Sequence, residues 1–110
     1  VGKVDAMYIP TDNMLANGMS TVIQVTTPAK IPVFAGEEGM VENGGLMTYG
    51  IDYYELGKLT AKQAIDILEN GKSTADMPIG YCTEFTFKVN EEAAKAMDIT
   101  IPQALLDQAK

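Results

Sequence analysis

The most informative stretch of the sequence is Val4-Asp5-Ala6-Met7-Tyr8-Ile9-Pro10-Thr11-Asp12-Asn13, an apolar run that stops abruptly at a polar tip. The apolar part is rich in strand-forming residues, and Pro10 closes it because proline has no N–H to give to a β-ladder. Beyond the tip, apolar residues recur at helical spacing as Leu15, Met19 and Val22. The stretch therefore predicts a strand followed by a helix, with Asp12 or Asn13 as the N-cap.

A second strand is predicted at Ile31-Pro32-Val33-Phe34-Ala35, and it also ends on a polar turn, Gly36-Glu37-Glu38-Gly39. The intervening helix provides the crossover that a parallel pair of strands requires. Because parallel strands end at the same edge of a sheet, both polar tips are expected at the edge where open α/β sheets bind ligands. A polar binding edge is the leading hypothesis from the residues alone.

The remaining pattern continues the alternation of strands and helices. A third strand is predicted at Leu46–Tyr49, and a helix follows from Asp52, which forms a capping-box-like start with Glu55. The apolar stripe of this helix consists of Ala61, Ala64, Ile65 and Leu68, and Asn70-Gly71 closes it. A fourth strand at Glu84–Val89, a helix from Asn90 through Met97 and a last helix from Pro102 towards Lys110 complete the chain. The predicted fold class is α/β, a three-layer Rossmann-like lobe with a mostly parallel sheet, and 110 residues predict a single domain, 1–110.

Composition argues against several function classes. A net charge of -7 without any basic run makes nucleic acid and anionic membrane surfaces poor partners. The chain has no histidine and a single cysteine, Cys82, which removes the usual zinc sites and any Ser-His or Cys-His catalytic pair. We therefore expect no metal, no cofactor and no enzymatic activity.

Three stretches in order resemble a known family: Asp5–Asn13, Ile31–Met40, and Thr48-Tyr49-Gly50-Ile51-Asp52-Tyr53-Tyr54-Glu55-Leu56-Gly57. They are similar to the carboxy-terminal part of ABC-transporter substrate-binding proteins, in the subgroup associated with tryptophan and other aromatic amino acids. The ending, Asn90–Met97 and Ile99–Pro102, is similar as well. The resemblance covers essentially the whole chain. Pro28 departs from the family's pattern, in which the first helix would continue at this position. From the residues alone, this helix should end or kink just before Pro28.

The resemblance implies one lobe of a type I periplasmic-binding-protein fold, in which two lobes close on a small molecule and deliver it to a membrane permease. The chain would be the carboxy-terminal lobe. The parent would be extracytoplasmic, either free in the periplasm or a lipoprotein at the outer face of the cell membrane. The segment Tyr49-Gly50-Ile51-Asp52 would cross between the lobes and serve as hinge and cleft wall.

The residues expected to bind the ligand lie at the strand ends: Thr11, Asp12, Asn13, Gly36, Glu37, Glu38, Tyr49 and Asp52. A carboxylate of Asp12, Glu37 or Glu38 would pair with the α-ammonium group, because a buried charge needs a partner. Thr11 and Asn13 would donate to the ligand carboxylate. Flat apolar walls for an aromatic side chain would come from Tyr49, Tyr53 or Tyr8.

Plainer interpretations remain open for the same residues. Asp12 and Asn13 fit a helix cap, Glu37-Glu38 fits a solvated turn with one residue facing the cleft, and Asp52 fits a capping box. At the level of function, the alternatives are a ligand-sensing regulatory domain of the same fold and a hydrolase with paired carboxylates. An isolated lobe is expected to bind ligand weakly and to self-associate through its uncovered surfaces.

Overall fold

In the computed structural model, which describes residues 2–109, strands β1 (Met7–Ile9) and β2 (Val33–Ala35) pair in parallel. Tyr8 lies opposite Phe34 in this register, and Ile9 lies opposite Ala35. Strand β3 (Met47–Ile51) adds to β2 in parallel, and β4 (Phe85–Val89) completes a four-stranded sheet of order β1-β2-β3-β4. The predicted α/β class with a mostly parallel sheet is confirmed.

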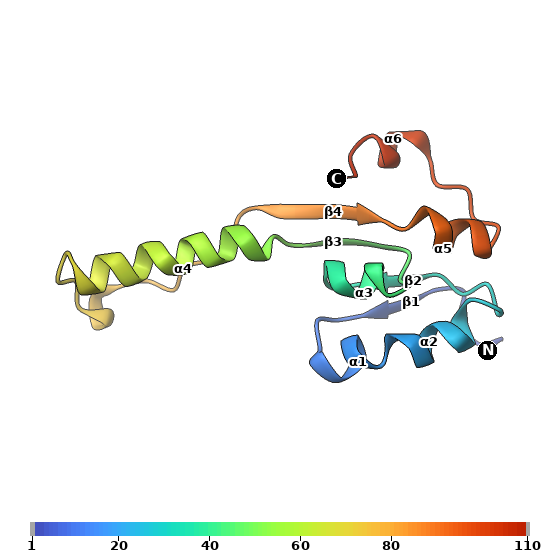
Figure 1. Ribbon diagram of the computed structural model, residues 1–110, viewed down its shortest axis with the longest axis horizontal. Coiled ribbons are helices and arrows are strands. Elements are labelled where there is room, and N and C mark those ends of the chain that lie inside the picture. The colour runs from blue at the N-terminus through green and yellow to red at the C-terminus, as the bar shows by residue number, and fades with distance from the viewer. Residues whose placement is uncertain (1, 110) are drawn as a thin grey trace. The chain divides into compact units, whose positions relative to one another are not determined.

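The described residues fall into two compact units (Figure 1). One unit holds the residues up to Gly50 and those from Thr86 onwards, and the other holds Ile51–Phe85. The first boundary falls inside the segment that was predicted to connect two lobes. That this segment acts as a hinge stays a prediction.

The first unit has a core on each face of its sheet. On one face, Ile9, Val33 and Ala35 pack with Met19, Met40 and Val41, which come from helices α2 (Met19–Thr26) and α3 (Glu38–Glu42). On the other face, Leu46 packs with Ala94 and Met97. Figure 1 shows α1 (Asn13–Asn17) and α2 below the strands of this unit and α6 (Gln103–Leu106) above them. The three predicted layers are therefore present in this unit.

The predicted first helix is divided into two. Helix α1 (Asn13–Asn17) begins after Asp12, and α2 (Met19–Thr26) begins after Gly18. Glycine is a weak helix former, and the Gly18 N–H bonds back to the carbonyls of Met14 and Leu15, as at the end of a helix. Helix α2 ends at Thr26, so the prediction that the helix stops just before Pro28 is confirmed.

A short helix was missed between the second and third strands, where the sequence indicated only a turn. Helix α3 (Glu38–Glu42) begins there because the Glu37 carboxylate accepts hydrogen bonds from two backbone N–H groups of the first turn. Glutamate is an uncommon N-cap, and Gly39 lowers the helix propensity of the segment. The local sequence therefore gave little sign of a helix that tertiary packing of Met40 and Val41 stabilises.

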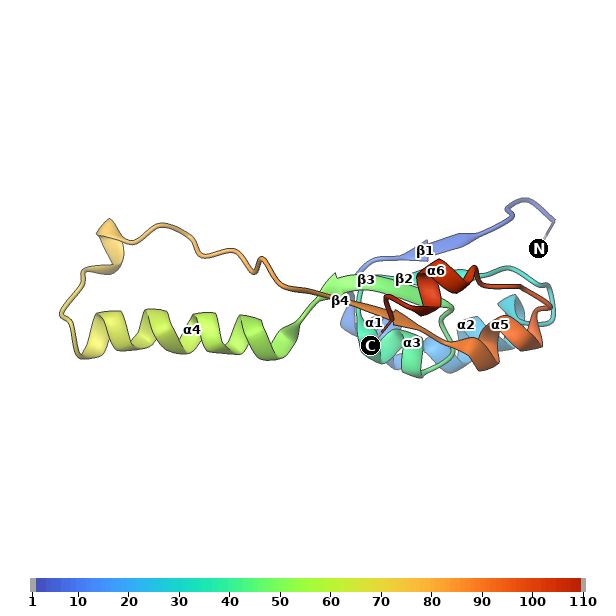
Figure 2. The same ribbon diagram turned by 90° about the horizontal axis from the view of Figure 1, so that it is seen from above.

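The second unit consists of α4 (Tyr53–Leu68), a single 3-10 turn (Thr74–Asp76) and an extended segment that returns along the helix (Figure 2). Gly71, with a φ of 66°, reverses the chain after the helix. None of the residues of α4 is buried. The predicted apolar stripe exists, but Ile65 is 49% exposed and Leu68 is 82% exposed.

Past β4 the chain returns to the first unit. Helix α5 (Glu91–Ala96) is capped by Asn90, whose side-chain oxygen accepts from the Ala93 N–H at 2.9 Å. The last helix, α6 (Gln103–Leu106), is shorter than predicted, and its predicted end at Lys110 lies outside the described residues. Thr86 is the buried residue of β4, whereas Phe85 is 45% exposed. The predicted alternation of burial is therefore limited to the start of the strand, since Phe87, Lys88 and Val89 are all partly buried.

Two glycines should respond oppositely to replacement by alanine. A methyl group at Gly44, where φ is 107°, would lie 2.8 Å from Cγ1 of Ile23, whereas nothing lies within 4 Å of one at Gly57 inside α4. We expect Gly44→Ala to destabilise the first unit by roughly 1–3 kcal/mol and Gly57→Ala to stabilise α4 by about 0.5–1 kcal/mol. Urea unfolding followed by circular dichroism measures both changes. Equal effects of the two substitutions would contradict the difference in backbone conformation.

Candidate functional site at the carboxyl edge of the sheet

The carboxyl ends of β1 and β2 are held together by their loops. The Gly36 N–H donates to the Ile9 carbonyl at 2.8 Å, and the Thr11 hydroxyl donates to the Gly36 carbonyl at 3.2 Å. A methyl group at Gly36 would lie 2.6 Å from the Thr11 nitrogen, so only glycine fits here without a shift of the loops. One at Gly50, in β3, would lie 3.0 Å from the Gly36 carbonyl oxygen. Three strand ends thus meet at one place.

Asp12 acts as a helix cap in this structure. Its carboxylate accepts from the Leu15 N–H at 2.9 Å, and the side chain is exposed. Asn13 is the first residue of α1. The capping interpretation of Asp12 is therefore correct, and its role in binding a ligand stays a prediction.

The two adjacent glutamates have different environments. The Glu37 carboxylate accepts from the Gly39 N–H at 2.9 Å and from the Met40 N–H at 2.8 Å, one bond to each oxygen. The Glu38 carboxylate lies 3.7 Å from Nζ of Lys88. Lys88 also forms a close ion pair with Glu42, and the hydrogen bond to Glu42 raises the pKa of Lys88. Glu37 is the glutamate whose carboxylate is fixed beside the strand ends.

An aromatic hollow lies next to these loops. It has a volume of about 280 Å³ and is lined by Tyr8, Phe34, Ala35, Gly36, Met47, Thr48, Tyr49 and Phe87. The rings of Tyr49 and Phe87 are 6.4 Å apart between centroids, with an angle of 49° between their planes. Tyr8 is 68% exposed and Tyr49 is 72% exposed, so flat ring surface remains accessible. The volume is close to the lower end of that of small-molecule pockets, about 300 Å³.

Sequence reasoning identified part of this hollow. Tyr8, Gly36 and Tyr49 were named, whereas Phe34, Met47, Thr48 and Phe87 were not. The parallel register places Phe34 beside both Tyr8 and Met47. The sequence predicted that the strands are parallel, but it did not predict which residues pair. The period-two pattern of the fourth strand already put Phe87 on a face opposite Thr86, which was the one usable signal.

Asp52 and Tyr53 belong to the second unit, whereas the other residues that were predicted to bind the ligand belong to the first unit. The Asp52 carboxylate accepts from the N–H groups of Tyr54 and Glu55, at 3.0 and 3.1 Å. Its own N–H donates to the Glu84 carbonyl at 3.2 Å, and Glu55 pairs with Lys58 instead of closing a capping box. Asp52 is a helix cap here, and its contact with a ligand stays a prediction.

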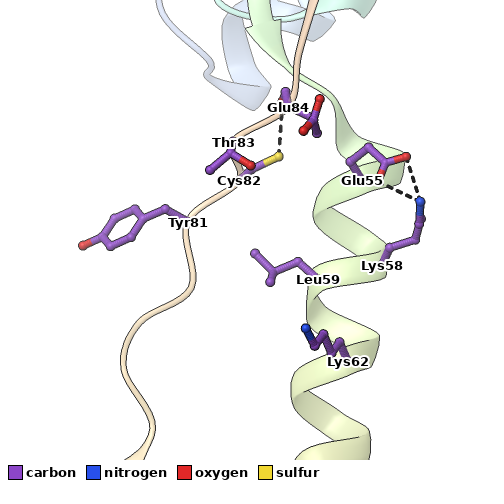
Figure 3. Close-up of a pocket in the computed structure, with 8 residues that line it drawn as sticks. All are labelled: Glu55, Lys58, Leu59, Lys62, Tyr81, Cys82, Thr83 and Glu84. Atoms are coloured by element: carbon purple, nitrogen blue, oxygen red, sulfur yellow. Dashed lines mark hydrogen bonds and ion pairs between the residues drawn. The ribbon is translucent and has the colours of Figure 1, made fainter.

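The second unit contains a larger hollow of about 360 Å³ between α4 and the returning segment (Figure 3). It is lined by Glu55, Lys58, Leu59, Lys62, Tyr81, Cys82, Thr83 and Glu84. Lys58 and Glu55 form an exposed ion pair at 2.9 Å, and the hydrogen bond to Glu55 raises the pKa of Lys58. Size favours this hollow as a ligand site, but chemistry favours the strand-end hollow, which is lined by several aromatic rings and by Gly36, the residue before Glu37.

The described residues, 2–109, contain no group of three or more His, Cys, Asp or Glu side chains arranged to hold a metal ion. None of their helices combines the length and the apolar character required to cross a bilayer.

Comparison with known proteins decides the family. The model of the family described as ABC transporter substrate binding protein matches residues 1–110. The chain belongs to this family. It is 43% identical over 99 residues to a tyrosine-binding protein of Clostridioides difficile, and the match covers 90% of this chain and 28% of that protein. The resemblance seen in the sequence is confirmed.

Solved structures of this family contain the same arrangement. An ABC domain from Streptococcus pneumoniae, determined in complex with L-Trp, matches with a TM-score of 0.86 and 36% identity. A ligand-free, open substrate-binding protein from Clostridium difficile matches with a TM-score of 0.77 and 41% identity. The matches cover 97% and 100% of this chain and 36% of each solved chain. The chain thus spans about a third of the length of these relatives.

Glu37 and Glu38 offer a matched pair of substitutions. Glu37→Ala removes the cap of α3 and should destabilise the first unit by about 0.5–2 kcal/mol. Glu38→Ala removes one partner of a surface ion pair and should cost at most about 1 kcal/mol. Urea unfolding of the two variants side by side measures the difference. A Glu38 variant at least as destabilised as the Glu37 variant would show that the cap is not what stabilises this turn.

Proposed function

We propose that this chain is part of a substrate-binding protein that captures an aromatic amino acid between two lobes for import by an ABC-transporter permease. The observation that carries the proposal is the aromatic hollow, which adjoins the Gly36-Glu37 turn on one sheet. The protein would work outside the cytoplasm, and binding without chemical conversion would be its whole task. The names of its relatives, tyrosine-binding and complexed with L-Trp, support this ligand class.

The hollow supplies the side-chain part of the site. Tyr49 and Phe87 already form a tilted pair of rings, and aromatic rings prefer such offset or tilted contacts to face-to-face stacking. A ligand ring placed against Tyr8 and Tyr49 would cover surface that is exposed in this structure. Burial of that surface, at about 25 cal/mol per Å², would supply much of the affinity.

The strand-end loops supply the polar part. An amino acid that enters a closed cleft loses water from its ammonium group, which then requires an anionic partner. The Glu37 carboxylate is fixed by its two backbone hydrogen bonds, and each of its oxygens keeps a lone pair for a further donor. Glu38 is less suited because Lys88 already lies beside its carboxylate. Asn13 is the candidate donor to the ligand carboxylate, because the Thr11 hydroxyl already donates its one proton to the Gly36 carbonyl.

The first test is a thermal-shift screen of the full-length protein against the common amino acids. A ligand at about 100 times its dissociation constant should stabilise the folded protein by about 2.7 kcal/mol. A shift confined to tyrosine, tryptophan and phenylalanine is the expected result. No shift with any amino acid would remove the proposed ligand class.

Tyr49→Ala should weaken aromatic amino-acid binding roughly 10-fold or more, equivalent to about 1.4 kcal/mol, because it removes one wall of the hollow. Titration calorimetry of the full-length protein measures the change. Tyr54→Ala is the matched control, since Tyr54 lies on α4 and is 75% exposed. Equal affinities of the two variants would place the ring of the ligand elsewhere.

A further inference from the structure

The chain contains three Asn-Gly pairs, which are Asn17-Gly18, Asn43-Gly44 and Asn70-Gly71. Asparagine is a chemically labile residue, and a following glycine makes it more so. Glycine has no side chain to keep its backbone nitrogen away from the side-chain carbon of the asparagine. All three asparagines are exposed. Exposure therefore does not distinguish the pairs, and the hydrogen bonds around each glycine decide which pair can react.

Loss of the asparagine amide is a reaction of the chain with itself and then with water. The glycine nitrogen gives up its proton to a base and attacks the side-chain carbonyl carbon of the asparagine. The new C–N bond closes a succinimide ring, and the side-chain nitrogen leaves as ammonia. Water then opens the ring and leaves a carboxylate, as aspartate or as isoaspartate. The reaction therefore needs a free glycine N–H and an asparagine that can rotate about its Cα–C bond.

In the first pair the glycine nitrogen is already engaged. The Gly18 N–H donates to the carbonyls of Met14 and Leu15, at 3.0 and 3.1 Å. Asn17 is the last residue of α1, and Gly18 directly precedes α2, so a helix adjoins the pair on each side. Rotation of Asn17 into the geometry of attack would break the hydrogen bonds of Gly18. We therefore expect this pair to react slowly in the folded protein.

In the second pair both reacting groups are engaged. The Gly44 N–H donates to the Val41 carbonyl at 3.1 Å, and Nδ2 of Asn43 donates to the Gly39 carbonyl at 2.7 Å. The turn is also tightly packed, since a methyl group at Gly44 would lie 2.8 Å from Cγ1 of Ile23. This pair should also react slowly, because both hydrogen bonds must break before the nitrogen can approach the amide.

The third pair lacks this protection. Gly71 follows the end of α4 at the tip of the second unit (Figure 2), and no described residue accepts a hydrogen bond from its N–H group. Its φ is 66°, and nothing lies within 4 Å of the position that a Cβ would take. The adjacent hydrogen bonds, from Asn70 to Ile65 and from Lys72 to Asp66, do not use the Gly71 nitrogen. That nitrogen is therefore accessible to base.

The Asn70 amide has a role in the folded chain that the reaction would remove. Its Nδ2 donates to Oδ1 of Asp66 at 3.1 Å, and Lys72 binds the other carboxylate oxygen at 2.8 Å. The hydrogen bonds from Lys72 and Asn70 lower the pKa of Asp66, so this carboxylate is charged. A new carboxylate at residue 70 would repel that of Asp66 and would add negative charge at the C-terminal end of α4. The last turn of the helix should loosen as a result.

We propose that Asn70 is a site of spontaneous deamidation, at which the folded protein converts a side-chain amide to a carboxylate while the amides of Asn17 and Asn43 persist. Water and base are the only reagents, so the modification requires no enzyme and no ligand. It involves none of the residues assigned to the candidate ligand site. Its test is therefore independent of the function proposed above.

Peptide mass spectrometry of the full-length protein measures the reaction. During incubation of the folded protein, the peptide that contains Asn70 should gain the mass of OH in place of NH2 roughly 10-fold or more faster than the peptides that contain Asn17 and Asn43. Its rate should rise with pH, because the attacking nitrogen must first lose its proton. In urea-unfolded protein the three peptides should convert at similar rates, because the protecting hydrogen bonds are gone.

Two variants provide a second measurement. Asn70→Gln keeps an amide but lengthens the side chain, which disfavours closure of the ring, so its peptide should keep its mass. Asn70→Asp reproduces one product of the reaction, and the amides in the last turn of α4 should exchange roughly 2- to 5-fold faster in it than in Asn70→Gln. Equal exchange in the two variants would remove the expected effect on α4.

Two results would overturn the proposal itself. Equal conversion of the three peptides in the folded protein would show that the hydrogen bonds of Gly18 and Gly44 give no protection. An Asn70 peptide that converts in urea but keeps its mass in the folded protein would show that the full-length protein holds Gly71 away from the amide.

Discussion

The parallel pairing of β1 with β2 is the constraint on which the site depends. It places Ile9, the last residue of β1, opposite Ala35, the last residue of β2. The loops that follow these two strands therefore begin at neighbouring positions on the same edge of the sheet. The hydrogen bonds between Gly36 and Ile9 and between Thr11 and Gly36 then join these loops. Because the register also sets Tyr8 beside Phe34, the same pairing that assembles the polar edge assembles the aromatic hollow next to it.

The acidic residues at the strand ends serve the fold first. Asp12, Glu37 and Asp52 each accept backbone N–H groups at the start of a helix, and these bonds fix the carboxylates in place. A carboxylate held in this way is preorganised for a cationic ligand group, since no side-chain freedom is lost when the ligand arrives. Capping and binding are therefore compatible, and Glu37 is the residue in which they combine best.

The two units of the chain differ in how well their residues are buried. The sequence predicted a single domain over residues 1–110, and this stays a prediction. The first unit has buried cores on both faces of its sheet, whereas α4 in the second has no buried residue. The second unit therefore differs from the first in lacking a buried helix, and the chain spans about a third of the length of its relatives.

By itself, the sequence determined the order of most elements, the parallel βαβ unit, the caps at Asp12 and Asp52 and the family, because these follow from short-range patterns and from motifs of several residues. Tertiary structure decided what those patterns did not contain. Helix α3 forms because Met40 and Val41 are buried, and Phe34, Met47 and Phe87 join the hollow through strand register. The apolar stripe of α4 was predicted from the sequence, but its exposure was not. Periodicity indicates that a helix has an apolar face, and only the surrounding structure decides whether that face is covered.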